Sequence, residues 1–371
     1  MGRRHILHVF PTFGVGGVQI AVVQLVNAMR GKYRHTIVAR DGDFGAAAKL
    51  EPTPDIALET VPLRKSGFLS FSNMRRARAV LNRIRPDLLV TYNWGTVEWV
   101  LGNHPSRICP HIHFESGFGP DESPARQLWR RVIARRMLLA GCRHVVVPSV
   151  TLYDIAVRVW HIPARRVIYI PNGVDCHRVG CSPDAAELAA LGIPRDVPVV
   201  GTVAALRPEK NLSRLLRAFA AVPAELNARL AIIGDGPERA RLVETAAGLG
   251  ISGRVVFVGH VSDPSRVLGA FALFGMTSDT EQMPLAVLEA MAAGLPVVAT
   301  DVGDTRRMLS EENLPFVVGA RDEAALTAGI VRLLSDRALA RYVGSANRER
   351  ARTEYNFESM MARYDALYAE P

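Results

Sequence analysis

The sequence predicts an α/β protein built from two doubly wound, Rossmann-like domains. Short apolar runs alternate with helical patterns along the chain, which is typical of parallel sheets covered by helices. This alternation pauses in a polar stretch containing glycine and proline, from about residue 170 to residue 198, and then begins again. Because 371 residues are too many for one ordinary core, two domains are expected.

The first domain, which we place at residues 1–175, contains apolar runs that we interpret as strands. They are residues 6–10, 36–39, 56–61, 87–91, 111–114, 144–147 and 167–170. Helical patterns lie between them at residues 17–29, 72–84, 123–139 and 150–160. Strands that alternate with helices in this way predict a parallel sheet.

The second domain, placed at residues 176–355, repeats the pattern. Its predicted strands are residues 199–203, 230–233, 255–258, 272–276, 296–299 and 316–318. Its predicted helices are residues 212–219, 239–248, 284–293 and 323–335, and a last helix follows at 358–368. Two such domains form a cleft between the carboxyl ends of their strands, where we expect a ligand.

The most informative stretch surrounds the start of the helix predicted at residues 284–293. Pro284 fits its first turn, because the missing N–H costs nothing there. Glu281 lies in the loop before this helix, and Glu289 lies just over one turn inside it. The amides of Leu285 and Ala286 open the helix and can receive an anion. Two acceptors for hydroxyl groups around a phosphate-binding helix start suit a sugar nucleotide.

Three loops at strand ends offer further contacts to a nucleotide. Arg207 and Lys210 precede a helix and can clamp a diphosphate, although an ordinary exposed basic loop has the same composition. The glutamates in the same domain favour the clamp. The turns at Gly234 and at His260-Val261 can line a nucleotide pocket with backbone groups, or are simply loops that need flexible residues.

A glycine loop joins the first predicted strand directly to a helix. Gly14, Gly16 and Gly17 let backbone amides approach a phosphate closely. A dinucleotide fingerprint has a third glycine where this chain has Gln19, so NAD is the weaker alternative even though Asp41 follows the second strand. A tight turn that binds no ligand is the other alternative.

Together these motifs resemble the retaining family 4 glycosyltransferases of the GT-B fold. The resemblance rests on the glycine loop, the basic loop, the glycine turn at residue 234, and the run from Glu281 to Gly294, and residues 172–175 look like the stretch between that family's domains. It covers essentially the whole chain. The two glutamates followed by Ala-Met-Ala-Ala-Gly are its most specific motif.

The resemblance implies roles for the donor-side residues. Glu281 would bind hydroxyl groups of the donor sugar, and Glu289 would bind those of the ribose. Lys210 and a nearby arginine would bind the diphosphate, which Gly16 and Gly17 would approach from the first domain.

The resemblance also assigns residues around the reacting bond. The amides of Leu285 and Ala286 would support the leaving phosphate. His113 matches a histidine that faces the sugar from the first domain, although a histidine satisfied by its own strand end is the alternative. Glu115 is the expected polar contact to the acceptor.

Two positions depart from the family pattern. The usual arginine lies five residues before the lysine, where this chain has Ala205, whereas Arg207 lies only three before it. The glycine that commonly follows the first glutamate is Gln282.

The activity implied is transfer of a sugar from a nucleotide diphosphate sugar to a glycan or lipid-linked acceptor, with retention and with neither metal nor other cofactor. A C-terminal segment, residues 356–371, would pack back on the N-terminal domain. Two alternatives share the fold: a nucleotide-sugar 2-epimerase, and a protein that binds nucleotide sugars without catalysis, which Ala205 keeps open.

The net charge of +9 comes mostly from arginine. No nucleic-acid motif accompanies it, so we expect no nucleic-acid partner. The helix predicted at 123–139 places Leu128, Trp129, Val132 and Ile133 on one side, with Arg136 within that sector. Burial against the sheet and contact with an anionic membrane explain this pattern equally well.

The expected location is the cytoplasm, with peripheral attachment to the inner face of a membrane left open. No apolar run reaches the roughly 18 residues that a membrane span needs. The four cysteines, Cys109, Cys142, Cys176 and Cys181, show no dense or regular spacing, so we expect reduced thiols.

Overall fold

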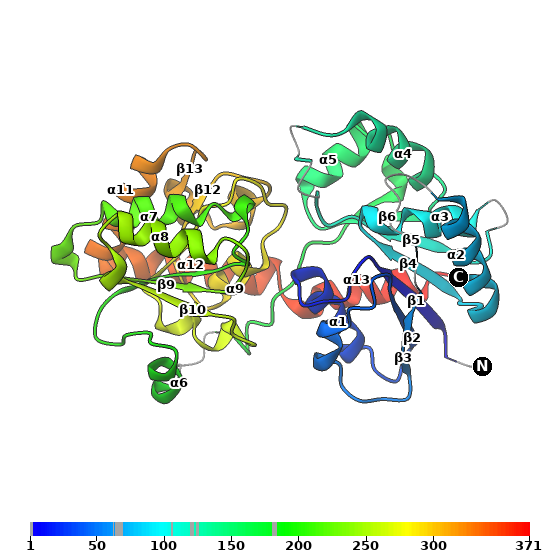
Figure 1. Ribbon diagram of the computed structural model, residues 1–371, viewed down its shortest axis with the longest axis horizontal. Coiled ribbons are helices and arrows are strands. Elements are labelled where there is room, and N and C mark those ends of the chain that lie inside the picture. Colours follow the sequence, from blue (N-terminus) through cyan, green and yellow to red (C-terminus); the bar gives the residue numbers. More distant parts are fainter. Residues whose placement is uncertain are drawn as a thin grey trace. The chain divides into compact units, whose positions relative to one another are not determined.

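The computed structural model describes residues 3–61, 63, 70–104, 107–118, 122–123, 126–179 and 184–371. The chain forms two compact units (Figure 1). The first comprises residues 1–171 together with 361–371, and the second comprises residues 172–360.

The first unit is built on a seven-stranded parallel sheet with the order β3-β2-β1-β4-β5-β6-β7. Its strands are β1 His5–Phe10, β2 Arg34–Ala39, β3 Ile56–Thr60, β4 Leu88–Tyr92, β5 His111–Phe114, β6 His144–Val147 and β7 Val167–Tyr169. Its helices are α1 Gly17–Ala28, α2 Phe71–Ile84, α3 Val97–Asn103, α4 Trp129–Leu139 and α5 Val150–Arg158.

The second unit is built on a six-stranded parallel sheet with the order β10-β9-β8-β11-β12-β13. Its strands are β8 Val199–Val203, β9 Arg229–Ile233, β10 Val255–Gly259, β11 Leu273–Met276, β12 Val297–Thr300 and β13 Val317–Val318. Its helices are α6 Ala185–Ala190, α7 Leu212–Ala220, α8 Arg239–Gly248, α9 Leu285–Ala292, α10 Thr305–Met308, α11 Glu323–Ser335 and α12 Arg337–Glu354. The last helix of the chain, α13, spans Phe357–Ala369.

These sheets confirm the predicted fold class. Every strand predicted from the sequence is present, and each end lies within two residues of its expected position. Apolar runs in the middle of a parallel sheet are buried on both faces, so their pattern is strong. In β1, for example, every residue is buried.

The helix that the sequence prediction missed most completely is α12. Its mean hydropathy is low, so little in the sequence indicates a buried face. Only four of its residues are buried, namely Val343, Gly344, Asn347 and Ala351. It packs on the end of α9 at Gly344, where an added Cβ would lie 2.0 Å from the carbonyl oxygen of Gly294. A helix held by so close a backbone contact needs few apolar side chains.

The helix predicted at residues 123–139 is shorter than expected, since α4 begins at Trp129. Leu128 caps it with an extended backbone, and Ser123 pairs instead with Arg126 in a short antiparallel bridge. The side of α4 that faces the interior carries Ala134, Arg135 and Leu139. Of the apolar sector expected from the sequence, Trp129 and Ile133 are exposed, so the explanation that these two side chains are buried against the sheet is wrong.

The division between the units lies a few residues before the expected boundary at 175. The side-chain amide of Asn172 donates to the carbonyl of Met283 at 2.9 Å, and the Val174 amide donates to the Tyr355 carbonyl at 2.8 Å. These contacts hold residues 172–175 to the second unit. The expected linker region after them also contains the short helix α6.

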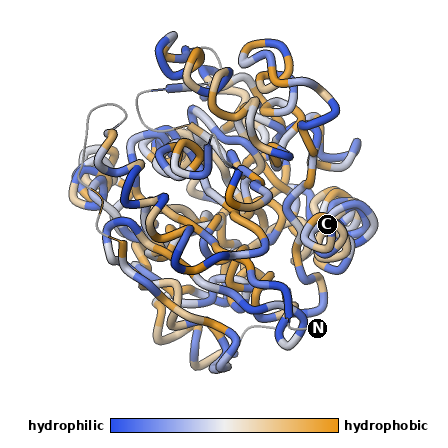
Figure 2. The backbone as a smooth tube through the Cα atoms, turned by 90° about the vertical axis from the view of Figure 1, so that its right-hand side faces the viewer, coloured by the Kyte–Doolittle hydropathy of each residue, from blue (hydrophilic) through white to orange (hydrophobic). Residues whose placement is uncertain are grey.

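The C-terminal end of α13 belongs to the first unit, whereas its first turn belongs to the second. Asp365 forms an ion pair with Lys32 at 2.5 Å and accepts a hydrogen bond from Tyr33 at 2.9 Å. The ring of Tyr364 stacks on Phe114, with centroids 5.5 Å apart. Figure 2 views the chain end of this helix nearly along its axis and shows hydrophobic and hydrophilic residues around it.

No helix among the described residues is long and apolar enough to cross a membrane. Cys109, Cys142 and Cys176 carry free thiols, and Cys181 lies outside the described residues.

Candidate functional site

The strand order of the second unit leaves one place where neighbouring loops diverge. From β8 the chain moves outward through β9 to β10, and it then returns to the other side of β8 as β11. The loops that follow β8 and β11 therefore leave the sheet in opposite directions. Such a switch point, at the carboxyl ends of parallel strands, is where open α/β sheets bind ligands.

Lys210 and Glu281 meet at this switch point. Lys210 ends the short 3-10 helix η4 (Pro208–Lys210) after β8, and Glu281 lies in the loop after β11. The Lys210 ammonium donates to a Glu281 carboxylate oxygen at 2.5 Å. Their side chains are only 26% and 13% exposed, so the pair is partly shielded from solvent. The structure thus brings together two of the residues that the sequence singled out.

The position of Glu281 depends on two residues that the sequence prediction missed. The hydroxyl of Ser278 donates to the same Glu281 oxygen at 2.7 Å. Gly303, in the loop after β12, has a φ of +58°, and an added Cβ would lie 2.4 Å from the Glu281 carbonyl oxygen. The Asp304 amide then donates to the carbonyl of Gln282 at 2.9 Å. Only tertiary structure shows that the Gly303 loop supports Glu281.

Helix α9 begins at Leu285, which lies four residues after Glu281. Pro284 is its N-cap rather than a residue of the first turn, and no side chain caps the helix. The amides of Leu285 and Ala286 belong to the first turn, where amides lack intrahelical acceptors. That they bind an anion stays a prediction. Glu289 is the fifth residue of α9 and is half-buried.

Arg207 does not join the Lys210–Glu281 pair in this structure. It precedes η4 with an extended backbone, and its guanidinium lies 4.0 Å from Glu209. Its side chain is 62% exposed and lines a hollow of about 230 Å³ with residues of α7 and α8, among them Arg217 and Arg241. Arg207 and Lys210 therefore lie at opposite ends of the η4 turn.

The predicted turn at Gly234 is a packing contact between loops. An added Cβ at Gly234 would lie 1.9 Å from the Ala204 carbonyl oxygen, and one at Gly236 would lie 2.6 Å from that of Leu206. The Gly234 amide donates to Gly259 at 2.8 Å, so it is occupied within the protein. This turn therefore shapes the loop that carries Lys210.

The turn after β10 places its two candidate residues differently. His260 is exposed, whereas Val261 is half-buried against the apolar core.

The first unit has a switch point of its own, between β1 and β4. The glycine loop follows β1, with Gly16 as the N-cap of α1 and Gly17 as its first residue. No side chain caps α1, so its first amides are open. The loop lies close to the turn after β2, because an added Cβ at Gly14 would lie 2.5 Å from a carboxylate oxygen of Asp43. The Phe13 amide also donates to the Asp43 carbonyl at 3.0 Å.

His113 and Glu115 lie in the interior of the first unit. His113 is on β5 and fully buried, and its Nδ1 lies 2.8 Å from the Thr91 hydroxyl. Its Nε2 faces a carboxylate oxygen of Glu115 at 3.7 Å. That same oxygen lies 3.5 Å from Nε of Arg135. The two residues predicted to meet sugar and acceptor are therefore brought together.

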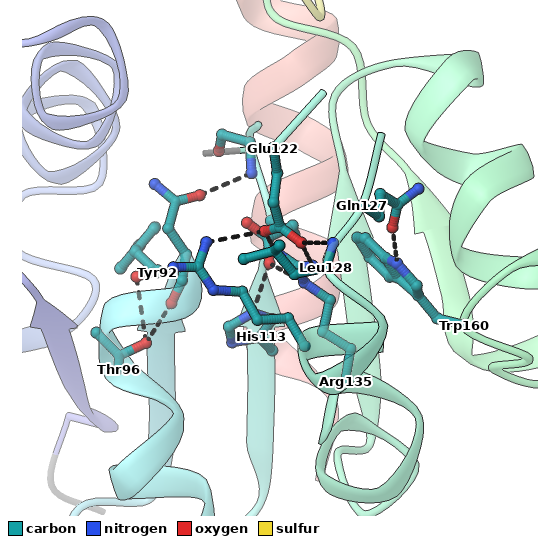
Figure 3. A network of polar contacts seen from close by, with 12 residues as sticks. Tyr92, Thr96, His113, Glu122, Gln127, Leu128, Arg135 and Trp160 are labelled. Atoms are coloured by element: carbon teal, nitrogen blue, oxygen red, sulfur yellow. Dashed lines mark hydrogen bonds and ion pairs between the residues drawn. The ribbon is translucent and has the colours of Figure 1, made fainter. Parts of the chain in front are cut away.

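Arg135 anchors this region, although nothing in the sequence singled it out. It lies on α4 and forms a two-fold hydrogen bond with Glu122, at 3.1 and 3.0 Å (Figure 3). Its guanidinium lies 4.8 Å from the centre of the Trp160 ring and 5.1 Å from that of Trp94. A planar cation between aromatic faces and a carboxylate tolerates burial.

The charge of Glu122 is stabilised by its neighbours. Burial acts to raise the pKa of its carboxyl, but hydrogen bonds from Arg135 and Arg131 outweigh burial and lower that pKa below its ordinary value. Glu122 also accepts a hydrogen bond from the Leu128 amide at 3.1 Å, which fixes the start of α4.

Among the described residues, no three histidine, cysteine, aspartate or glutamate side chains are grouped so that they could hold a metal ion.

Two family models match the chain, one in each half. Glycosyltransferase Family 4 matches residues 15–178, and glycosyl transferases group 1 matches residues 184–350. Together they span most of both units.

Named relatives fall in the same class. The chain is 27% identical over 383 residues to 2-deoxystreptamine N-acetyl-D-glucosaminyltransferase of Streptomyces fradiae, covering 95% of this chain and 88% of that protein. It is 27% identical over 207 residues to N-acetyl-alpha-D-glucosaminyl L-malate synthase of Bacillus anthracis, covering 56% of this chain and 54% of that protein. The second match thus spans about half of that relative's length.

Solved structures share the whole fold. Anabaena HepE, solved with UDP and glucose, superposes with a TM-score of 0.84 at 18% identity, covering 98% of this chain and 99% of HepE. Sucrose-phosphate synthase from Thermosynechococcus elongatus gives a TM-score of 0.80 at 23% identity, covering 99% of this chain and 98% of that one.

The support that Gly303 gives to Glu281 can be tested by adding one methyl group. We expect Gly303→Ala to lower the free energy of unfolding by roughly 2–4 kcal/mol, because a left-handed backbone and an overpacked contact each add a cost. Urea unfolding monitored by circular dichroism measures this loss.

Gly250→Ala is the matched control. Gly250 has a φ of +71° but no atom within 4 Å of an added Cβ. It should lose only roughly 1 kcal/mol, the cost of the backbone alone. Equal losses in the two variants would show that the Gly303 contact does not hold the Glu281 loop.

Proposed function

Because this chain belongs to the GT-B glycosyltransferases, we propose that it moves a sugar from a nucleotide diphosphate sugar to a glycan or lipid-linked acceptor. We further propose that the transfer retains the anomeric configuration and needs neither metal nor other cofactor. The donor is bound by the second unit, at the switch point of its sheet. The proposal of a nucleotide-sugar donor is supported by HepE, which has the same fold and was solved with UDP and glucose.

The observation that carries this proposal is the Lys210–Glu281 pair beside the uncapped start of α9. The chain places a cation, a carboxylate and open helix amides within one short region. A diphosphate requires the cation and the amides, and a sugar requires an acceptor for its hydroxyl groups. In the ligand-free protein each charge of the pair balances the other.

Donor binding exchanges the partners of this pair. The diphosphate takes Lys210 and the amides of Leu285 and Ala286, while the sugar hydroxyls donate to Glu281. As the bond to the anomeric carbon breaks, negative charge grows on the leaving phosphate. Fixed donors directed at that charge lower the barrier, since they need no reorganisation during the reaction. Lys210 and the helix start supply the positive charge that a metal supplies elsewhere.

Retention is proposed to follow front-face attack, in which the leaving phosphate helps to remove the acceptor's proton. In the second unit, the carboxylate nearest to Lys210 is that of Glu281. Because Lys210 and Ser278 both donate hydrogen bonds to it, we do not assign it as a nucleophile. Glu289 binds the ribose, and Gly16 and Gly17 contribute backbone amides from the first unit. His113 binds the sugar, and Glu115 serves the acceptor.

The Glu281 role predicts a separation between binding and transfer. Incubated with UDP-sugars and GDP-sugars in turn, the protein should release the nucleoside diphosphate of its own donor slowly even without acceptor. Glu281→Ala should lower that release at least about a hundred-fold, because sugar contacts strengthen towards the transition state. Its affinity for the free nucleoside diphosphate, measured by calorimetry, should change less than about three-fold.

Glu323→Ala is the matched control, because it removes a glutamate of the same unit that pairs with Arg217 at the surface. It should leave both quantities unchanged. Equal loss of nucleotide affinity and turnover in Glu281→Ala would contradict the sugar-binding role. Conversion of the donor to another nucleotide sugar would replace transfer with epimerisation, and binding without turnover would mark a protein that has lost catalysis.

We also propose that the protein works at the inner face of a membrane, held there by α4. This helix exposes Trp129, Ile133 and Met137, which are 70%, 47% and 72% exposed and lie four residues apart on one face. Arg130 and Arg136 beside them are exposed as well. An apolar stripe flanked by cations suits the headgroup region of anionic lipids. The free thiols fit the reducing cytoplasm.

Vesicle binding measures this attachment. The protein should sediment with vesicles that contain one-third phosphatidylglycerol, and binding should weaken as salt rises, because the arginines contribute through charge. Trp129→Glu should reduce the bound fraction at least about five-fold. Tyr342→Glu, which changes an aromatic on α12 that is 61% exposed, should have no effect. Equal binding by both variants would show that α4 does not contact the membrane.

A further inference from the structure

A continuous row of buried polar groups crosses the first unit and ends at His113. The Cys142 sulfur lies 3.5 Å from His111 Nδ1, and His111 Nε2 lies 2.7 Å from the Thr91 hydroxyl oxygen. That oxygen lies 2.8 Å from His113 Nδ1, and His113 Nε2 faces Glu115 at 3.7 Å. All five side chains are buried, at most 3% exposed.

The fold explains why these groups meet. His111 and His113 are two residues apart on β5, so their side chains lie on the same face of the sheet. Thr91, on the neighbouring strand β4, is paired directly with His113. The Thr91 hydroxyl is thus held between two imidazole rings.

A single hydroxyl between two imidazoles cannot donate to both, because it has only one hydrogen, and if it accepted from both, neither ring would receive that hydrogen. When it accepts from one ring and donates to the other, both ends of the row must indicate the same direction. The two ends of the row are Cys142 and Glu115, and both indicate the same direction for the hydrogen bonds between them.

At the Cys142 end, the sulfur is a donor. Burial raises the pKa of the Cys142 thiol to about 12, so it keeps its hydrogen. Burial also lowers the pKa of His111 well below its ordinary value, so this imidazole is neutral and has one N–H. A thiol hydrogen directed at His111 Nδ1 leaves the His111 proton on Nε2, from which it is donated to Thr91.

At the Glu115 end, the carboxylate is an acceptor. The guanidinium of Arg135 is always charged, and its Nε lies 3.5 Å from the Glu115 oxygen, which favours the anionic carboxylate. An anion facing His113 Nε2 favours a proton on that nitrogen. The opposite direction along the row would turn a lone pair of His113 towards the carboxylate.

Unused hydrogen-bonding capacity lies at this same end. Among the residues that the structure describes, His113 Nε2, both oxygens of Glu115 and Nε of Arg135 are buried without a hydrogen bond. A donor and an acceptor thus lie side by side, which is the combination that a hydroxyl group matches.

We propose that Thr91 and His111 are positioning residues that hold His113 in the tautomer protonated on Nε2. Through them, His113 presents a hydrogen-bond donor beside the Glu115 acceptor, the arrangement that binds a sugar hydroxyl. The tautomer itself depends only on the first unit. Its role in turnover rests on the proposed glycosyltransferase function.

The tautomer is measured directly by long-range 15N–1H NMR of protein labelled at its 10 histidines, with His113 assigned by its loss in His113→Gln. The wild-type signal should show a proton on Nε2. Thr91→Ser keeps the hydroxyl and should keep this tautomer. Thr91→Val removes the hydroxyl at nearly constant size, so His113 should lose its single tautomer.

Turnover of the donor should follow the tautomer. Thr91→Val should lower kcat at least about ten-fold, as a misoriented imidazole does elsewhere, and Thr91→Ser should remain within about two-fold of wild type. Thr36→Val is the matched control, because Thr36 makes the same kind of hydrogen bond, at 2.8 Å, to His5 Nε2. It should change neither the His113 tautomer nor kcat.

A wild-type His113 protonated on Nδ1 would overturn the proposal, and this measurement requires no variant to fold. An unchanged Nε2 proton in Thr91→Val would also overturn it. A protein that turns over no nucleotide sugar would refute the proposed function alone, since the tautomer would still decide the roles of Thr91 and His111.

Discussion

The ion pair between Lys210 and Glu281 is the interaction on which the proposed donor site of the second unit depends. Its partners lie in loops that follow β8 and β11, neighbouring strands whose loops diverge because the chain reverses its direction across the sheet. Partial burial strengthens the attraction between the charges, and it also makes either charge costly without a partner. The pair therefore requires that any ligand replace both partners together. A molecule with both a diphosphate and a sugar does so.

Close backbone contacts fix the loops that carry this pair. Gly303 supports the Glu281 loop from the strand beyond, and Gly234 and Gly236 support the loop that leads to Lys210. Asn172 fastens the chain between the units to Met283, two residues after Glu281. The first unit uses charge for the same purpose, since Arg135 and Glu122 tie α4 to the region around His113 and Glu115. In the second unit, Lys210 and Glu281 thus lie in loops held by a rigid sheet, whereas in the first unit His113 lies on β5 itself and Glu115 directly follows that strand.

The sequence predicted the features that depend on local pattern. Buried strands, the glycine loop and the helix start after Glu281 all lie where apolar runs and turn residues indicated. Other features depend on tertiary contacts that leave little trace in the sequence. Arg207 is separated from Lys210 by a three-residue turn that the sequence did not predict. Helix α12 has few apolar residues because its Gly344 packs directly on the backbone of Gly294. Nothing in the sequence distinguishes Arg135 from the other arginines near it, yet aromatic rings and a carboxylate bury it.

The central claim is that the loop after β8 and the start of α9 hold a diphosphate, and backbone hydrogen exchange tests it most directly. Exchange followed by mass spectrometry, with and without saturating UDP, GDP or ADP, locates the amides that a nucleotide protects. The account predicts that the nucleotide which raises the Tm slows exchange at residues 204–211 and 285–287. Bound phosphate oxygens accept hydrogen bonds from the amides of Leu285 and Ala286 and from the Lys210 ammonium, and the bound lysine stabilises the loop after β8 against local opening. Protection confined to the first unit, at residues 14–18 for example, would contradict it.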